Sequence, residues 1–232
     1  MDDRNVGPSA LRTRLLDLLE WVLPSPCLAC ARPIRAWRPR LGLCVPCRGQ
    51  LRPLETACVQ CGEPLAGAHI PPAYRCGRCR LDPPAFDRLL ACWSYEPPLD
   101  AVVRELKFSG LFYLATHLGT ELARRFGPAL TTVDQIVPVP LHWRRQIGRG
   151  YNQSGEIARA LGRCTGLPVT TALRRQRGTK AQTSLPRSQR RHNLRGAFRA
   201  RRSVELTGAS VALIDDVMTT GATLESCSRA LR

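Results

Sequence analysis

Two adjacent carboxylates lie near the C-terminal end of the sequence, in a pattern of residues that could bind a phosphorylated sugar. Asp215 and Asp216 follow the apolar run 211–214 and precede a short turn that is rich in hydroxyl groups. Paired carboxylates can accept hydrogen bonds from two adjacent ribose hydroxyls, while backbone N–H groups and threonine hydroxyls at a helix N-terminus can hold a phosphate. A helix cap would need only one aspartate, so capping does not account for the whole motif. This acid motif therefore predicts a ribose phosphate site made of Asp215, Asp216, Val217, Met218, Thr219, Thr220, Gly221, Ala222 and Thr223.

Cysteines dominate the first third of the chain and form four Cys-x-x-Cys pairs there. Each pair places two thiolates on one side of a metal, and a second pair completes a tetrahedral site. The order along the chain favours two zinc ribbons, although pairing of the first Cys-x-x-Cys with the third stays open. Thioredoxin-like redox chemistry is less favoured because no pair lies in a βαβ context. We expect two structural Zn²⁺ ions, held by Cys27, Cys30, Cys44 and Cys47 and by Cys58, Cys61, Cys76 and Cys79.

Two arginine-rich segments are candidates for binding a diphosphate. Arg145 and Arg149 follow the predicted strand 135–139, and Lys180 and Arg190 lie in the basic, loop-like stretch 174–195. The second segment could close over a diphosphate as a flap, neutralise its charge and exclude water. A solvated arginine-rich surface is the alternative explanation for both segments.

Charge and composition limit the classes of partner. The chain has 232 residues and a formal net charge of +17, which comes almost entirely from arginine because Lys107 and Lys180 are the only lysines. Such a surplus attracts polyanions, but an aromatic content of 6% gives no evident stacking platform for single-stranded DNA. No apolar run approaches the roughly 20 residues that span a bilayer, and no export signal is recognisable. We therefore expect a cytoplasmic protein without a membrane span.

The composition changes near residue 82 and predicts three parts. Residues 1–24 have the pattern of an amphipathic helix, residues 25–82 that of a double zinc ribbon, and residues 83–232 that of an α/β domain. In the last part we expect strands at 87–95, 135–139 and 211–214 and helices at 99–108, 111–126 and 153–164, with another helix after the acid motif. Such alternation predicts a parallel sheet with helices on both faces and a ligand at the carboxyl ends of its strands.

The chain as a whole resembles the ComF family, whose members join an N-terminal zinc ribbon to a type I phosphoribosyltransferase domain. The acid motif resembles the motif with which such transferases bind phosphoribosyl pyrophosphate (PRPP). Family members usually continue into at least one more strand, so we expect the sheet to lack its last strand. Besides the cysteine pairs and the acid motif, the resemblance rests on Leu106-Lys107, 137–142, Arg145, 149–153, Gln182, Leu185, Arg190, Asn193 and 196–198.

The resemblance implies a protein that binds PRPP with Mg²⁺, could transfer its phosphoribosyl group with release of pyrophosphate, and is associated with DNA uptake in natural competence. It implies that Asp215 and Asp216 hold the ribose hydroxyls and residues 217–223 hold the 5-phosphate. Arg145, Lys180 and Arg190 would stabilise the leaving group, and Arg149 would bind PRPP. The alternative is a non-catalytic protein that binds PRPP, a nucleotide or single-stranded DNA, or that assists DNA-uptake proteins.

Overall fold

A parallel pair of strands forms the centre of the α/β part. The structure, a computed structural model, describes residues 24–35, 40–65, 71, 73–141, 150–176, 194 and 196–232. Strand β3 (Gln135–Pro138) pairs in parallel with β6 (Val211–Ile214), with Gln135 opposite Val211 and Pro138 opposite Ile214. Their carboxyl ends therefore lie side by side, and the acid motif follows directly from one of them.

The sheet is smaller and more mixed than the predicted parallel sheet. Beside the parallel pair, β4 (Leu173–Arg175) and β5 (Phe198–Ala200) form an antiparallel pair, and Val169 makes an isolated parallel bridge to Ile136. The described residues therefore form a mixed α/β fold with a small parallel sheet. Strand β4 overlaps the start of the predicted basic loop, of which residues 177–193 lie outside the described part.

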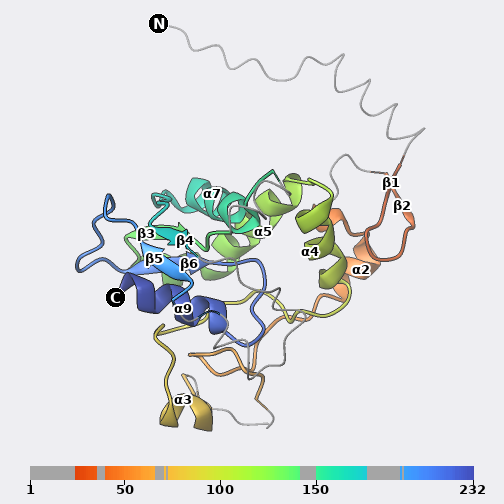
Figure 1. The fold of residues 1–232 in the computed structure, drawn as a ribbon. Coiled ribbons are helices and arrows are strands. Elements are labelled where there is room, and N and C mark those ends of the chain that lie inside the picture. Colours follow the sequence, from red (N-terminus) through yellow and green to blue (C-terminus); the bar gives the residue numbers. More distant parts are fainter. Residues whose placement is uncertain are drawn as a thin grey trace, which may run out of the picture.

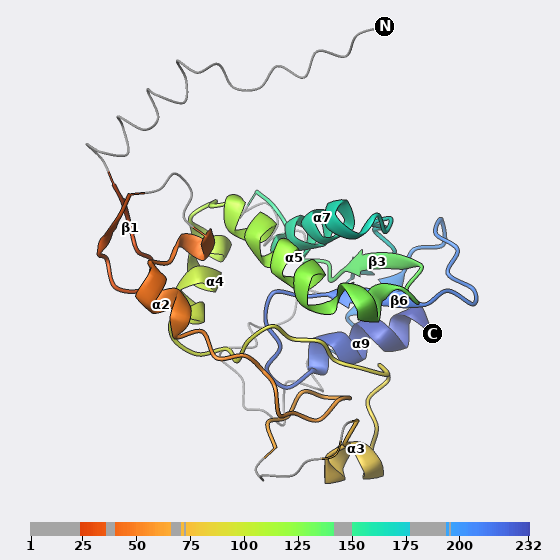
Figure 2. The same cartoon turned by 180° about the vertical axis from the view of Figure 1, so that it is seen from behind.

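Helices cover both faces of the strands, as Figures 1 and 2 show. Helix α5 (Tyr113–Phe126) packs against α7 (Gln153–Thr165) on one side of β3 and β6, while α9 (Ala222–Leu231) lies on the other side. The approach of α5 to α7 is close because Gly119 has no side chain, and a Cβ there would lie 2.5 Å from the Cβ of Ala160. The helices predicted at 99–108, 111–126 and 153–164 are confirmed within two residues.

The first ribbon (residues 25–50) is packed into the main hydrophobic core. It contains β1 (Ser25–Pro26), β2 (Pro33–Ile34), the 3₁₀ turn η1 (Arg40–Gly42) and α2 (Val45–Gly49). Leu41 and Leu43 are each 1% exposed and share one buried cluster with residues of α4 (Leu99–Phe108) and α5. The backbone N–H of Leu41 donates to Nδ1 of His117 at 2.9 Å. This ribbon and the helices therefore stabilise each other.

The second ribbon (residues 57–81) lies apart from the first and has its own small core. Figures 1 and 2 show its helix α3 (Gly77–Leu81) at the end of the molecule farthest from α7. Its buried cluster consists of Cys58, Cys61 and Cys79, with Leu65 and Cys76 packed against it. A core this small indicates that the thiol cluster itself must hold the second ribbon together.

The strand predicted at 87–95 is wrong. The segment forms no strand; Trp93 alone makes a bridge, to Pro53, while the N–H of Leu89 donates to Val59 O at 3.0 Å and that of Ser94 to Arg52 O at 2.9 Å. Leu90 and Trp93 are partly buried against the main core cluster, and Leu89 against the cluster that contains residues of α9. This packing, rather than a sheet, explains the misleading pattern.

Two further features complete the fold. The 3₁₀ turn η2 (Gly127–Leu130) follows α5 and leads toward β3. None of the helices in the described part of the chain is long and apolar enough to cross a membrane. The amphipathic helix predicted at 1–24 lies, except for residue 24, outside the described residues.

Candidate functional site: two thiol clusters and an acid motif

The eight cysteines of the ribbons form two separate clusters in sequential order. The first thiol cluster is Cys27, Cys30, Cys44 and Cys47, the second is Cys58, Cys61, Cys76 and Cys79, and in each the four Sγ atoms lie within 4.8 Å of one another. Sγ of Cys30 lies 3.7 Å from that of Cys44, and Cys61 and Cys76 show the same distance. A tetrahedral zinc with Zn–S bonds of about 2.3 Å requires S···S distances of about 3.8 Å. Both clusters are thus consistent with one structural Zn²⁺ each, and the interleaved pairing does not occur.

Hydrogen bonds to sulfur prepare one thiol of each cluster for ionisation. Burial alone would raise the pKa of Cys27, but N–H groups outweigh it, among them that of Cys44 at 3.4 Å, and the pKa falls to about 6. Cys58 is equivalent: burial opposes ionisation, yet N–H donors including that of Cys76 at 3.3 Å lower its pKa to about 6. Burial instead raises the pKa of Cys47 to about 12. Because zinc binds thiolates, the first cluster needs a bound cation for full ionisation.

The acid motif begins where β6 ends, and each carboxylate there has its own partner. Oδ1 of Asp215 accepts hydrogen bonds from Oγ of Ser154 and from the N–H of Asp216, both at 3.0 Å. Oδ2 of Asp216 lies 3.2 Å from Nζ of Lys107, the last-turn cation of α4. The two carboxylates are therefore held by two different helices, α7 and α4.

The environment of Asp215 favours its protonated form. Burial raises the pKa of Asp215 to about 7, and the neighbouring charge of Asp216 acts in the same direction. The bonds from Ser154 and from the Asp216 N–H, together with the charge of Lys107, oppose this shift only in part. Asp215 consequently changes protonation near neutral pH, and a ligand that donates hydrogen bonds to it would favour the ionised form.

The start of α7 positions both partners of the carboxylates. The phenol of Tyr151 donates to the carbonyl of Leu106, and Nε2 of Gln153 lies 3.5 Å from the carbonyl of Lys107. These side chains bind carbonyls in the last turn of α4, which lack partners inside the helix. Ser154 follows at the next position, so one short segment orients the end of α4 and contacts Asp215.

The turn after the carboxylates leads into a helix N-terminus. Gly221 has a φ of +75°, which glycine adopts without strain, and it is the N-cap residue of α9. The N–H of Ala222 lies 3.4 Å from Oγ1 of Thr220. Thr219 and Thr220 thus stand in the turn and Thr223 in the first turn of α9, an arrangement suited to an anion.

A cavity of about 430 Å³ adjoins the acid motif. Asp215, Asp216, Thr219 and Thr220 line one part of it. Apolar side chains from the segment 89–95, from α4 and from α5 line much of the remainder, and residues of the second ribbon close one wall. This acid-motif cavity can hold a ligand that has a polar end, which hydrogen-bonds to carboxylates and hydroxyls, and a less polar end.

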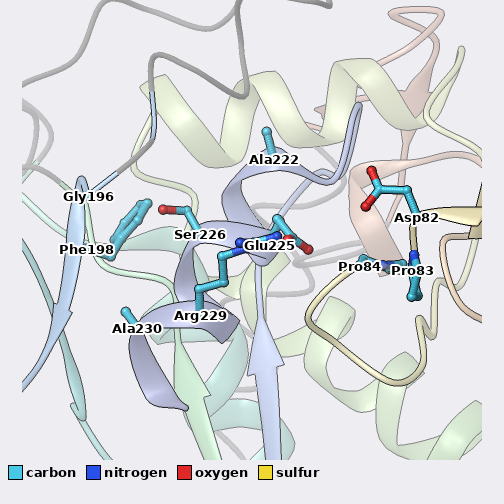
Figure 3. A pocket seen from close by; sticks show the side chains of 10 residues that line it. All are labelled: Asp82, Pro83, Pro84, Gly196, Phe198, Ala222, Glu225, Ser226, Arg229 and Ala230. Carbon is cyan, nitrogen blue, oxygen red and sulfur yellow. Dashed lines mark hydrogen bonds and ion pairs between the residues drawn. The ribbon is translucent and has the colours of Figure 1, made fainter.

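A second cavity, of about 410 Å³, lies beside α9 and contains few of the predicted site residues. Figure 3 shows it between Asp82–Pro84 on one side and Phe198 on the other, with Glu225 and Arg229 of α9 between them. Its charged groups are engaged, because Glu225 accepts from the N–H of Ala85 and from Nε of Arg229, both at 2.6 Å. This cavity therefore offers weaker chemistry than the acid motif.

The structure brings together only part of the predicted site. Arg145, Arg149, Lys180 and Arg190 all lie outside the described residues. Sequence reasoning missed the roles of Lys107 and Ser154, which reach the carboxylates from distant parts of the chain. The rarity of lysine was a usable signal for Lys107, whereas nothing in the sequence distinguishes Ser154 from other serines.

Comparison with known proteins identifies the family to which this chain belongs. The chain is 35% identical over 218 residues to DNA utilization protein YhgH of Escherichia coli strain K12, which covers 90% of this chain and 91% of the relative. It is 33% identical over 198 residues to Competence protein F of Haemophilus influenzae, with 82% and 84% covered. The chain belongs to the ComF/YhgH family.

Other comparisons agree with this ComF/YhgH assignment. Competence protein ComFC of Bacillus subtilis is 24% identical over 197 residues, which cover 84% of this chain and 79% of ComFC. The family model for the double zinc ribbon domain matches residues 18–80, the region that holds both thiol clusters. No solved structure matches the chain.

Proposed function

We propose that this ComF/YhgH protein binds PRPP at the acid motif and transfers its phosphoribosyl group to an acceptor. One observation carries the proposal: the carboxylates, the threonine turn and the N-terminus of α9 follow one another at the carboxyl end of β6 and border one cavity. A ribose 5-phosphate needs hydroxyl acceptors on one side and an anion site on the other, and this order supplies both.

The proposed roles follow from the chemistry of each group. Asp215 and Asp216 accept hydrogen bonds from the ribose hydroxyls, and residues 217–223 hold the 5-phosphate. In the reaction the bond from C1 to the diphosphate oxygen breaks, a bond from C1 to the acceptor forms, and the acceptor loses a proton. Positive charge develops on the ribose, so the nearby carboxylates stabilise it. Arg145, Arg149, Lys180 and Arg190, all outside the described residues, are proposed to bind the diphosphate.

Mg²⁺ is part of the proposal as a companion of PRPP. It prefers hard oxygen ligands and keeps several waters, so the diphosphate and ribose oxygens would supply its ligands. When bound, it neutralises charge on the diphosphate. Lys107 already neutralises Asp216 at 3.2 Å, so the carboxylates are assigned to the sugar hydroxyls rather than to the metal.

Titration calorimetry with PRPP and Mg²⁺ tests the site. Wild type should bind, and Asp215→Asn together with Asp216→Asn should weaken binding at least about tenfold, because the amides replace charged acceptors. Asp87→Asn is the matched control, since the Asp87 side chain is 94% exposed. Equal affinity of the double variant and wild type would overturn the site assignment.

Turnover needs a separate measurement. Pyrophosphate release should be followed with PRPP, Mg²⁺ and a panel of nucleobases and amines as acceptors. Release that depends on one acceptor would support transfer, whereas tight PRPP binding without release over the whole panel would support the non-catalytic alternative. In that case the protein would act as a PRPP-dependent accessory.

Single-stranded DNA is the second candidate ligand. The net charge of +17 favours a polyanion, and relatives are named for DNA utilization and competence. Affinity for a single-stranded oligonucleotide should then fall steeply as salt rises, because phosphate contacts release counterions. Absent binding, or binding that ignores salt, would remove this candidate.

A further inference from the structure

The two ribbons have different neighbours, and among their described residues only those of the second touch the acid-motif cavity. Cys61 and Arg78 of the second ribbon line that cavity together with Asp215 and Asp216. Cys61 and Cys79 also border a narrow gap whose other side is formed by Thr220 and Gly221. Two zinc-binding thiols therefore stand next to the turn proposed to hold the phosphate.

The chain that leaves the second ribbon connects it to the acid motif by direct contacts. Nε2 of Gln60 donates to the carbonyl of Phe86 at 3.3 Å, and Gln60 itself is only 5% exposed. The ring of Phe86 faces the turn, because a Cβ at Gly221 would lie 3.8 Å from its Cζ. The first Cys-x-x-Cys knuckle of this ribbon is thus held to Phe86, and Phe86 to the turn.

A second contact fixes the same segment to α9. The N–H of Ala85 donates to Oε2 of Glu225 at 2.6 Å, and Glu225 stands in the first turn of α9. Figure 3 shows Glu225 on the side of α9 that faces the linker Asp82–Pro84. The N-terminus of α9 and the second ribbon are therefore joined through a linker only a few residues long.

The first ribbon has contacts of another kind. Cys27 and Cys47 belong to the main core cluster with α4 and α5, and neither lines the acid-motif cavity. Loss of its metal would weaken the core that it shares with α4 and α5, but would leave in place the wall of the cavity that the second ribbon forms.

We infer that zinc in the second thiol cluster is coupled to ligand binding at the acid motif, whereas zinc in the first cluster is not. The inference rests on the proposed function, because it takes PRPP as the ligand. Zinc fixes the knuckle 58–61, which is hydrogen-bonded to Phe86 and Leu89. Leu89 forms part of the wall of the acid-motif cavity, and Phe86 packs against the turn at Gly221. Without zinc the small core of the ribbon cannot keep this wall in position. Coupling is reciprocal, so bound PRPP must also strengthen the hold on this zinc.

The test compares one cysteine from each cluster in the full chain. Cys79→Ser and Cys30→Ser should each retain one zinc ion instead of two, measured by a colorimetric chelator after denaturation. Calorimetry with PRPP and Mg²⁺ should show at least a tenfold loss of affinity for Cys79→Ser and less than a threefold change for Cys30→Ser. Cys30→Ser should instead show the larger drop in melting temperature.

Zinc release provides the reciprocal measurement. A chelator should remove two zinc ions from wild type at different rates. PRPP with Mg²⁺ should slow the release of the zinc ion in the second cluster. The zinc that remains in Cys30→Ser should be protected by PRPP, and that in Cys79→Ser should not. If Cys79→Ser does not fold, Gln60→Met replaces it, because it keeps all thiols yet removes the bond to Phe86, and its affinity should fall several-fold.

The outcomes separate the two proposals. Absence of PRPP binding by wild type would overturn the proposed function and this inference with it. Wild-type affinity in Cys79→Ser after loss of its second-cluster zinc, or in Gln60→Met where that variant is used, would overturn the inference alone. Equal protection of both zinc ions by PRPP would also contradict it.

Discussion

Nζ of Lys107 lies 3.2 Å from Oδ2 of Asp216, where the last turn of α4 meets the carboxyl end of β6. Both side chains are largely buried, with 24% and 12% of their surfaces exposed. An ion pair shielded from solvent is less screened than a surface pair. The positive charge of Lys107 therefore offsets the negative charge of Asp216 and limits its repulsion of Asp215.

Replacement of Lys107 tests this function. Lys107→Met retains most of the side-chain length but removes the charge, so the carboxylates repel each other more strongly and an anionic ligand loses a nearby cation. We expect affinity for PRPP with Mg²⁺ to fall about tenfold, or about 1.4 kcal/mol, by calorimetry. Arg104→Met is the matched control on the same helix, with a side chain 59% exposed. Unchanged or tighter binding by Lys107→Met would contradict this role.

The protonation of Asp215 predicts a pH-dependent stability. Burial raises the pKa of Asp215 to about 7 in the folded protein, against about 3.9 in an unfolded chain. Between these values the folded state holds a proton that the unfolded state has lost, so the contribution of Asp215 to stability falls as pH rises. Asparagine cannot ionise and removes this dependence.

Urea unfolding of wild type and Asp215→Asn at pH 5.5 and pH 8 measures the effect. The variant should gain at least about 1 kcal/mol relative to wild type between the two pH values. Asp87→Asn should show no such gain, because the carboxylate of Asp87 is 94% exposed to solvent. Parallel pH profiles for wild type and Asp215→Asn would show that Asp215 ionises normally.

Packing of the first ribbon into the core predicts a large cost for a mutation there. Leu41→Ala should lower the free energy of unfolding by about 2–4 kcal/mol, because Leu41 is 1% exposed. Val45→Ala, four residues away and 70% exposed, should change it by less than about 0.5 kcal/mol. Chemical unfolding followed by circular dichroism should show a single transition shifted in Leu41→Ala. An effect as small as that of Val45→Ala would contradict the shared core.

The contact between α5 and α7 predicts intolerance to one added methyl group. A Cβ at Gly119 would lie 2.8 Å from the carbonyl of Ile157, a backbone atom that cannot move freely. Gly119→Ala should cost about 1–3 kcal/mol by denaturant unfolding. Gly49→Ala is the control, since no atom lies within 4 Å of a Cβ there. Similar stability of the two variants would show that the helices can separate at little cost.

The sequence predicted local elements well and tertiary contacts poorly. Periodicity and spacing are local properties of the sequence. They predicted helices α4, α5 and α7, strands β3 and β6 and the favoured grouping of the cysteines. The strand prediction for 87–95 was wrong because partial burial against two core clusters produces an apolar run like that of a strand. Periodicity cannot separate the two causes.

The side chains that contact the acid motif could not be predicted from the sequence either. Asp215 and Asp216 stood out because carboxylates, hydroxyls and glycine follow one another within a few residues. Ser154 lies 61 positions before Asp215, and Lys107 lies still farther from Asp216. Contacts of that separation arise from the packing of α4 and α7 on β6, which no spacing rule encodes.

The shared core of the first ribbon also bears on how this chain can be divided or recombined. Val102, Leu106 and Leu114 are fully buried in the cluster that includes Cys27, Leu41 and Cys47. A fragment beginning after residue 82 would expose such side chains to water, at a cost of about 1.5–3 kcal/mol for each fully uncovered leucine or valine. The ribbon and the helices would have to be transferred to another protein together, because each exposes apolar side chains to water when the other is absent.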